Sequence, residues 1–148
     1  MVLPSEIIIM SREEFFDTEM AKDIVASEKK SLSQSINYRV SNCDYIYAVE
    51  LRKKLSTVED DVYKKYCDNA KSLIEGLEKA NAGDSRSQFN VGRCFMQKYF
   101  FFNPQEAWYY VNLAKSQYLP GAKEYLESMR EEFEGVVDFS TDDNSPSA

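Results

Sequence analysis

The chain has 148 residues, of which 43% are hydrophobic, and its 25 Asp and Glu against 18 Lys and Arg give a net charge of −7. This length and composition predict one folded domain with a short tail, and the acidic balance argues against the backbone of a nucleic acid as the main partner. The sequence has no histidine, which excludes Ser-His-Asp and Cys-His nucleophilic sites, HExxH zinc sites and histidine general bases.

Residues 1–11 are expected to form an amino-terminal arm. The arm contains the apolar run Ile7 to Met10, which either folds back into the groove of the helical domain or packs against the start of the first helix as a hydrophobic staple. The run lacks a basic flank and is too short for a signal peptide. Nowhere does an apolar stretch reach the roughly eighteen residues that a membrane helix needs. We therefore expect no membrane span in this chain.

Helix signals recur along residues 12–135. Ser11 and Glu14 form a capping box that predicts a helix over about 12–31, and the polar stretch 31–41 separates it from a second helix at about 43–55. Ser56 with Glu59 is another capping box, followed by the longest apolar stripe. Further start and stop signals delimit three more helices. The sequence therefore predicts an all-α fold of about six helices: 12–31, 43–55, 56–81, 84–96, 104–118 and 122–133.

The chemistry-bearing residues are few. Cys43, Cys67 and Cys94 form no CxxC pair and are odd in number, which is typical of reduced, mostly buried thiols in an intracellular protein. The acidic clusters lie at helix starts, where the helix dipole accounts for them, and there is no glycine-rich phosphate loop. We therefore expect no enzyme, no cofactor and no metal site.

Residues 83–120 carry the spacing of a helical repeat. Small residues at Gly92, Ala107 and Ala114 would let two antiparallel helices approach closely, while Phe95 and Val111 fill the space between them. This spacing resembles the tetratricopeptide pattern. The long connection between the two helices, the Gly83-Asp84 pair and Trp108-Tyr109-Tyr110 resemble the Sel-like relatives of that family, although Gln88 stands where the tetratricopeptide family has Trp.

The resemblance implies helix pairs stacked as a short right-handed superhelix. A second, weaker unit would cover residues 42–82, with Ala48 at the small position and Ala70, Ile74 and Leu77 on its second helix. The alternative is a helical bundle without repeats, in which these alanines fall at such spacings by accident.

The layout is also similar to that of the mitochondrial fission adaptors (fission protein one). Val40-Ser41 followed by Tyr45-Ile46-Tyr47-Ala48 is similar to the opening of that family's first repeat, and Phe89-Asn90-Val91-Gly92 resembles the opening of its second. This resemblance implies an adaptor on the mitochondrial outer membrane that recruits fission machinery. Members normally end in a transmembrane anchor, so either the anchor is missing from this sequence or the resemblance is accidental.

A helical repeat normally binds a segment of a partner protein in its concave face. Four polar side chains share one face of the helix at 84–96 and are suited to a carboxylate or to peptide carbonyls, and four consecutive aromatics follow at 99–102, where contact with a partner or weak self-association is expected. The alternatives are an ordinary solvated face and aromatics covered by the last helix. The expected partner-binding residues are Arg86, Asn90, Arg93, Gln97, Tyr99 and Phe101.

Residues 136–148 are acidic, small and polar, and they are expected to be a disordered tail after a helical-repeat domain at 12–135. The sequence thus predicts a non-enzymatic adaptor or inhibitor that binds a protein or peptide. Its expected location is the cytoplasm, or the cytosolic face of mitochondria if an anchor was removed.

Overall fold

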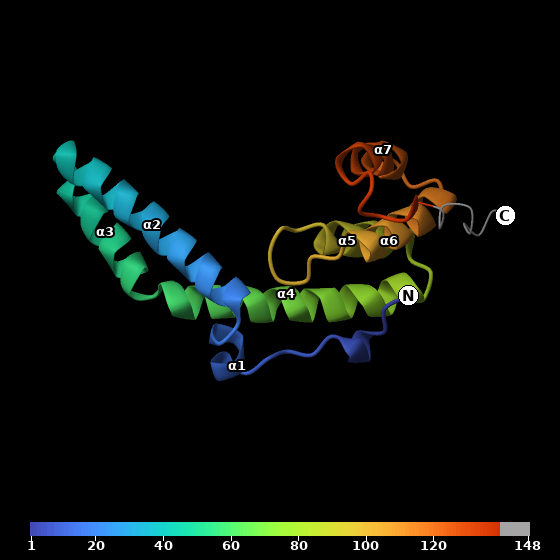
Figure 1. Ribbon diagram of the computed structural model, residues 1–148, viewed down its shortest axis with the longest axis horizontal. Coiled ribbons are helices and arrows are strands. Elements are labelled where there is room, and N and C mark those ends of the chain that lie inside the picture. Colours follow the sequence, from blue (N-terminus) through green and yellow to red (C-terminus); the bar gives the residue numbers. More distant parts are fainter. Residues whose placement is uncertain (140–148) are drawn as a thin grey trace. The chain divides into compact units, whose positions relative to one another are not determined.

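The computed structural model describes residues 1–139, and residues 140–148 of the expected tail lie outside this described part. The described residues form an all-α fold, as predicted, with no strand between residues 1 and 139 (Figure 1). None of these helices combines the length and the apolar character needed to span a bilayer. The elements are the 3-10 turn η1 (Pro4–Glu6), α1 (Arg12–Phe16), α2 (Glu19–Ser41), α3 (Tyr45–Ser56), α4 (Val58–Asn81), α5 (Ser85–Phe95), α6 (Pro104–Ser116) and α7 (Ala122–Glu132).

The chain divides into two compact units, and the boundary falls inside α4. One unit is Ile9–Asp68, and the other combines Met1–Ile8 with the chain from Asn69 onward. The sequence, by contrast, predicts a single domain over residues 12–135. Because the apolar stripe of α4 runs through the boundary without a break, hydrophobic periodicity does not mark it.

In the Ile9–Asp68 unit, two expected helix boundaries are wrong. The helix predicted over 12–31 is interrupted at Asp17, and α2 begins anew after Thr18, whose hydroxyl accepts a hydrogen bond from the Ala21 N–H (3.1 Å). The polar stretch 31–41, expected to be a connection, is helical to Ser41. It is helical because α2 packs along α3 there, and Ile36 is buried in that packing.

The same packing changes the pairing of helices. The weaker repeat predicted over 42–82 pairs the helix at 43–55 with the long helix after it. In the structure α3 has α2 as its antiparallel neighbour, joined through the short loop Asn42–Asp44, and Ala48 and Leu51 of α3 are buried (Figure 1). Ala70 and Leu77 belong to the other unit.

The core of the Ile9–Asp68 unit is aromatic. Phe15 is completely buried and stacks on Tyr66, with ring centroids 4.6 Å apart, and its ring also lies 5.6 Å from that of Tyr63. The two tyrosine hydroxyls hold the backbone of Met10: its N–H donates to Tyr66 (2.9 Å) and its carbonyl accepts from Tyr63 (2.8 Å). The predicted capping box of Ser11 and Glu14 is confirmed. Together these contacts fix the start of α1.

The other unit is built on the close approach of α5 and α6. A Cβ atom added at Gly92 would lie 2.4 Å from Cγ2 of Val111 and 3.2 Å from the Ala107 carbonyl oxygen. Ala107 and Ala114 are themselves completely buried. The prediction that these three small residues let two helices nest is therefore confirmed. Gly76 serves α4 in the same way, facing Val91.

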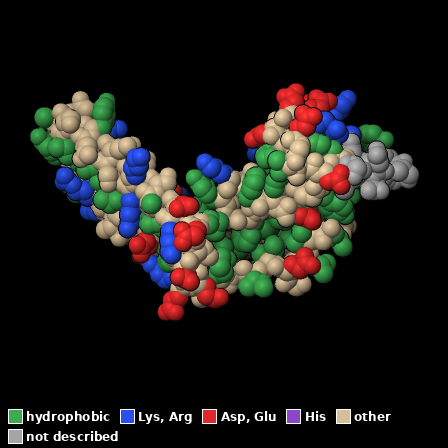
Figure 2. Space-filling model, in the orientation of Figure 1, with side chains coloured by type: hydrophobic (Ala, Val, Ile, Leu, Met, Phe, Trp, Pro, Cys, Tyr) green, Lys and Arg blue, Asp and Glu red, His purple; other side chains and the backbone are tan. Residues whose placement is uncertain are grey.

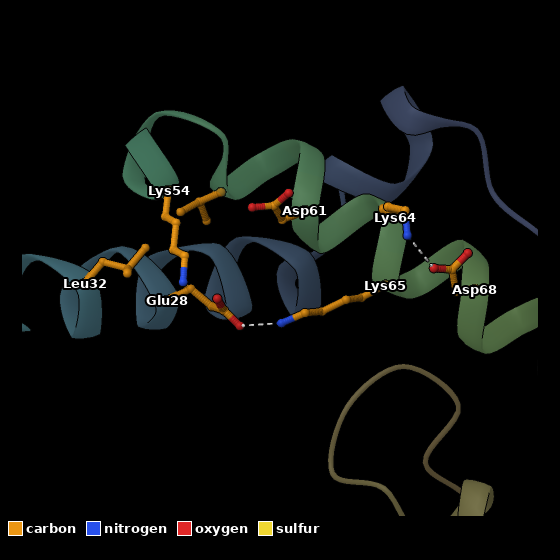
Figure 3. Close-up of a pocket in the computed structure, with 8 residues that line it drawn as sticks. Glu28, Leu32, Lys54, Asp61, Lys64, Lys65 and Asp68 are labelled. Atoms are coloured by element: carbon orange, nitrogen blue, oxygen red, sulfur yellow. Dashed lines mark hydrogen bonds and ion pairs between the residues drawn. The ribbon is translucent and has the colours of Figure 1, made fainter. Parts of the chain in front are cut away.

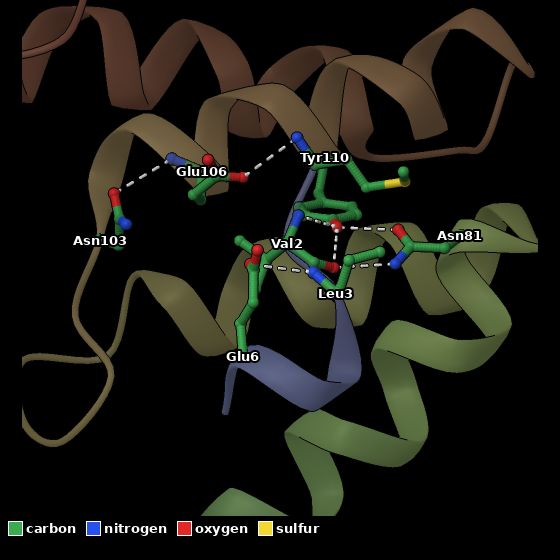
Figure 4. A network of polar contacts seen from close by, with 8 residues as sticks. Val2, Leu3, Glu6, Asn81, Asn103, Glu106 and Tyr110 are labelled. Atoms are coloured by element: carbon green, nitrogen blue, oxygen red, sulfur yellow. Dashed lines mark hydrogen bonds and ion pairs between the residues drawn. The ribbon is translucent and has the colours of Figure 1, made fainter. Parts of the chain in front are cut away.

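The amino-terminal arm is anchored in this second unit. The Val2 N–H donates to the Tyr110 hydroxyl (3.0 Å), and the Val2 carbonyl accepts from the side-chain amide of Asn81 (2.8 Å; Figure 4). The Tyr110 hydroxyl donates in turn to Asn81 Oδ1 (2.8 Å), and burial raises the pKa of Tyr110. Val2 and Ile7 pack against the apolar core. Ile7 therefore docks on the core of this unit, which is neither the groove nor the start of the first helix, the two places that were expected for the apolar run.

The helical core extends beyond residue 135, where the tail was expected to begin. Val137 is buried, and the ring of Phe139 lies edge-on to that of Trp108 at 4.5 Å. The backbone of Asp138 exchanges two hydrogen bonds with the side-chain amide of Gln105, at 2.8 and 3.1 Å. Residues 136–139 are thus ordered, because the two apolar side chains find a place on the core.

Candidate partner-binding site

The candidate site is built on α5, which begins where the sequence predicted. Asp84 caps it: one carboxylate oxygen accepts from the Arg86 N–H (3.1 Å) and the other from the Ser87 hydroxyl (3.0 Å). The Ser87 hydrogen bond is the main reason that the pKa of Asp84 is lowered. Val91, Gly92 and Phe95 turn one side of α5 into the core. The opposite side is therefore left to solvent.

Gln88, which stands where the tetratricopeptide pattern has Trp, is a buried polar residue. Its Nε2 donates to the Ala80 carbonyl (3.1 Å), and its Oε1 accepts from Gln117 Nε2 (2.8 Å). The side chain thus ties the end of α4 and the residue after α6 to α5. Because its hydrogen-bonding atoms are satisfied, burial of this amide is tolerated.

The four polar residues predicted for one face of the α5 segment are all exposed, and three of them line one groove. Arg86 is exposed but lies outside the groove. The groove runs along α5 and the turn after it, and α7 supplies its remaining wall. It is lined by Asn90, Arg93, Cys94, Met96, Gln97 and Tyr125.

Sequence reasoning missed three of the groove residues, Cys94, Met96 and Tyr125, and Tyr125 is the one that lies far from α5 in the sequence. It appeared only as part of the apolar stripe of the last helix, and no local pattern links it to α5. In the structure its ring stands edge-on to Phe89 at 5.5 Å, and the Arg93 guanidinium lies 5.8 Å from the Phe89 ring centre. Burial raises the pKa of Tyr125, while the charge of Arg93 opposes the rise. Arg93 and Tyr125 thus both lie close to the Phe89 ring.

The charge of Arg93 is not neutralised within the described part of the chain. No Asp or Glu of residues 1–139 lies within ion-pair distance of Arg93, and the same holds for Arg86 and Lys98. Three unpaired cations along one short segment are notable in a protein of net charge −7. A guanidinium beside the side-chain amides of Asn90 and Gln97 is suited to hold a carboxylate with two parallel hydrogen bonds, together with the backbone of a peptide.

The aromatic segment after α5 does not contribute to the groove. Tyr99 and Phe102 are exposed, and the Lys98 ammonium lies 5.6 Å from the Tyr99 ring centre. Phe101, predicted as a partner-binding residue, is half-buried and packs against the core. Phe102 lies 6.1 Å from Phe133. The expected surface for self-association is thus reduced to Tyr99 and one edge of Phe102.

A second hollow lies in the Ile9–Asp68 unit, between α2, the end of α3 and the start of α4 (Figure 3). Its charges largely neutralise one another, since Lys65 pairs with Glu28 (3.5 Å) and Lys64 with Asp68 (3.1 Å). For that reason it is a weaker candidate than the groove on α5. It is lined by Glu28, Leu32, Lys54, Val58, Asp61, Lys64, Lys65 and Asp68.

Comparison with protein-family models, with curated proteins and with solved structures gave no match. The groove must therefore be judged on its own chemistry. Within residues 1–139 no three Cys, Asp or Glu side chains gather in a way that would hold a metal ion. What the groove does present is a cation, two amides and an apolar wall, which is the composition of a peptide-binding surface.

Cys94 offers a chemical probe of this groove. Burial raises the pKa of the Cys94 thiol, and the nearby Arg93 charge opposes the shift. Because the thiolate is the reactive form, we expect iodoacetamide at neutral pH to modify Cys94 at least about tenfold more slowly than exposed Cys43. Peptide mapping by mass spectrometry over a time course measures both rates. Equal rates would contradict the burial of Cys94.

Proposed function

We propose that this chain is a non-enzymatic protein-interaction module, an adaptor or an inhibitor, built as a short tetratricopeptide-like repeat in the cytoplasm. The observation that carries the proposal is the Arg93 guanidinium, which has no ion-pair partner within residues 1–139 and lies with Asn90 and Gln97 in a groove that Tyr125 closes on one side. The nesting of α5 and α6 at Gly92 supports the repeat. The proposed occupant is a segment of another protein.

The groove indicates the chemistry of that segment. An Asp or Glu side chain, or a carboxyl terminus, would pair with Arg93. Asn90 and Gln97 would exchange hydrogen bonds with the peptide groups on either side, because a side-chain amide has both a donor and an acceptor. A neighbouring apolar side chain would lie on Met96 and Tyr125. An arginine and an aromatic residue side by side are typical of residues that dominate binding energy.

Charge reversal in the groove is expected to abolish partner binding. In Arg93→Glu with Gln97→Ala, the introduced carboxylate repels the partner's carboxylate and one backbone contact is lost, so we expect the Kd to rise at least about 30-fold. Quantitative affinity purification identifies proteins retained by the wild type, and titration calorimetry with the purified partner gives both constants. An unchanged melting temperature of the variant would show that its fold is intact.

The matched control reverses a charge outside the groove. Lys71→Glu alters an exposed α4 lysine without an ion-pair partner in the described chain, and it adds the same negative charge. We expect it to retain every partner of the wild type. A protein that neither variant retains in the affinity purification depends on the net charge of the chain and not on the groove. Recovery of all wild-type partners by the groove variant would refute the proposed site.

A second candidate function rests on the resemblance to the fission adaptors. Val2 and Ile7 pack on the helical core, whereas the resemblance to the fission adaptors implies an arm that folds back into the groove. As a fission adaptor, the chain would act at the cytosolic face of the mitochondrial outer membrane and recruit fission machinery. Overproduction in cells is expected to fragment or elongate the mitochondrial network, and an unchanged network would count against this candidate.

A further inference from the structure

The free end of the α2–α3 hairpin exposes an unusual concentration of large apolar side chains. Ile46 is 85% exposed and Tyr38 is 64% exposed, although both are in well-formed helices. Figure 2 shows hydrophobic side chains gathered over this end of the hairpin. We call this surface the hairpin end, and it comprises Tyr38, Tyr45, Ile46, Tyr47 and Val49.

These side chains surround the hairpin end rather than forming one stripe. Tyr45, Ile46 and Tyr47 are consecutive and all exposed, so each points about 100° further around the axis of α3. Tyr38 extends the surface onto α2. A protein partner would contact one side of the hairpin end and leave the side chains on its other sides exposed to solvent. The interfacial layer of a bilayer encloses the hairpin end on all sides and would bury all of these side chains.

Several polar groups of the connecting loop are already hydrogen-bonded within the hairpin, which lowers the cost of taking them out of water. The Asp44 carboxylate accepts from the Tyr47 N–H (3.3 Å) and pairs with Arg39 (3.4 Å). The Asn42 side chain donates to the Tyr38 carbonyl (2.8 Å), and the Cys43 N–H donates to the Val40 carbonyl (3.0 Å). Arg39 also lies 4.4 Å from the Tyr47 ring centre. The loop therefore needs few hydrogen bonds from water.

Basic residues stand behind the apolar end. Residues 29–56 include six Lys and Arg but only two Asp and Glu, a net charge of +4 within an acidic protein. Lys30, Arg52 and Lys54 have no ion-pair partner within residues 1–139. With a rise of about 1.5 Å per residue, these cations lie about 10–17 Å from the loop end of the hairpin. Figure 2 shows Lys and Arg side chains further along the hairpin than the apolar ones.

We propose that the hairpin end inserts into the surface of a membrane that contains anionic lipids. Insertion by about 5–10 Å carries Tyr45, Ile46 and Tyr47, which are nearest the loop, deepest into the interfacial layer. Tyr38 and Val49 lie about one helical turn further from the loop, at the level of the headgroups. At that depth the unpaired cations are within about one Debye length of the anionic phosphates. Insertion of apolar side chains and attraction of the cations to anionic lipids are each weak, and stable attachment to a membrane takes two such contributions together.

The test is co-sedimentation of the full chain with lipid vesicles. We expect the wild type to sediment with vesicles of phosphatidylcholine and phosphatidylserine and to remain in the supernatant with phosphatidylcholine alone. Ile46→Asn should abolish sedimentation. Arg52→Glu with Lys54→Glu should lower the partition coefficient at least about 25-fold, since each basic residue at an anionic surface is worth about fivefold.

Two controls separate the hairpin end from general effects. Tyr118 is 92% exposed and lies in the other unit, so Tyr118→Asn removes an exposed aromatic ring without touching the hairpin end. Lys71→Glu with Lys123→Glu reverses two exposed charges outside residues 29–56. Both controls should sediment like the wild type. The proposal is overturned if the wild type does not bind anionic vesicles, or if Ile46→Asn binds them as well as the wild type does. It is also overturned if neither protein binds vesicles and Ile46→Asn loses a protein partner of the wild type, because the hairpin end would then be a protein-binding surface.

Discussion

Replacing Gly92 by Ala is expected to lower the free energy of unfolding of the unit that contains α5, α6 and α7 by about 2 kcal/mol. The new methyl group would lie 2.4 Å from Val111 Cγ2 and 3.2 Å from the Ala107 carbonyl oxygen. The second of these atoms is backbone, so α5 and α6 would have to separate. Overpacking of this kind costs up to about 3 kcal/mol, and the better helix propensity of Ala returns only about 1 kcal/mol.

Gly76→Ala is the matched control, because it makes the same chemical change in the same unit. Outside its own helix, its Cβ would come within 4 Å of one atom of the described residues, Val91 Cγ2 at 2.9 Å, so the helices need to separate less than at Gly92. We expect a change of less than about 1 kcal/mol, since propensity and crowding nearly cancel. Urea unfolding followed by fluorescence of the single, buried Trp108 reports on this unit. Equal stability of the two variants would mean that α5 and α6 are not in close contact.

Local signals in the sequence predicted much of the local structure, but the capping box of Ser56 and Glu59 is wrong: Ser56 ends α3, and its hydroxyl donates to the Lys53 carbonyl (2.6 Å). The caps of Ser11, Asp84 and Asn103 each need only side-chain and backbone groups within three residues, and all three are confirmed (Figure 4 for Asn103). The small residues of α5 and α6 were also correctly placed, because a Gly followed by two alanines at helical spacing is typical of two closely packed helices. These features require no knowledge of distant parts of the chain.

Features that depend on tertiary packing were missed. Residues 31–41 are too polar for an apolar stripe, yet they are helical because Ile36 is buried where α2 packs along α3. Phe139 lies at the start of the acidic, polar tail, yet its ring packs edge-on against Trp108. In both cases one or two apolar side chains decide the structure of several polar neighbours. Periodicity averages over a window and cannot detect so sparse a signal.

The candidate site divides in the same way. Asn90, Arg93 and Gln97 were predicted together because helical spacing alone places them on one face. Tyr125 lies in a different helix, well beyond Gln97 in the sequence, and reaches the groove only because α7 packs against α6 and its ring meets Phe89. The exposed hairpin end was missed for a similar reason. Tyr45 to Val49 have the composition of a core helix, and only the structure shows that they remain uncovered.

Phe15→Ala is expected to have the largest effect on stability, a loss of about 3–5 kcal/mol in the Ile9–Asp68 unit. Phe15 is completely buried and contacts three aromatic rings, those of Phe16, Tyr63 and Tyr66, at centroid distances of 5.1, 5.6 and 4.6 Å. Its removal leaves a cavity at the point where Tyr63 and Tyr66 hold the backbone of Met10. Chemical denaturation followed by far-ultraviolet circular dichroism measures the loss.

Phe16→Ala provides the comparison, because it removes the same side chain from the adjacent position. Phe16 is only partly buried, and its ring lies under the Arg12 guanidinium at 5.0 Å. Truncation there loses a partly exposed contact and leaves no enclosed cavity, so we expect a cost of about 1 kcal/mol. The difference between the two variants isolates the contribution of burial from that of helix propensity, which is the same for both. If the two substitutions proved equally costly, the aromatic core around Phe15 would not be what fixes the start of α1.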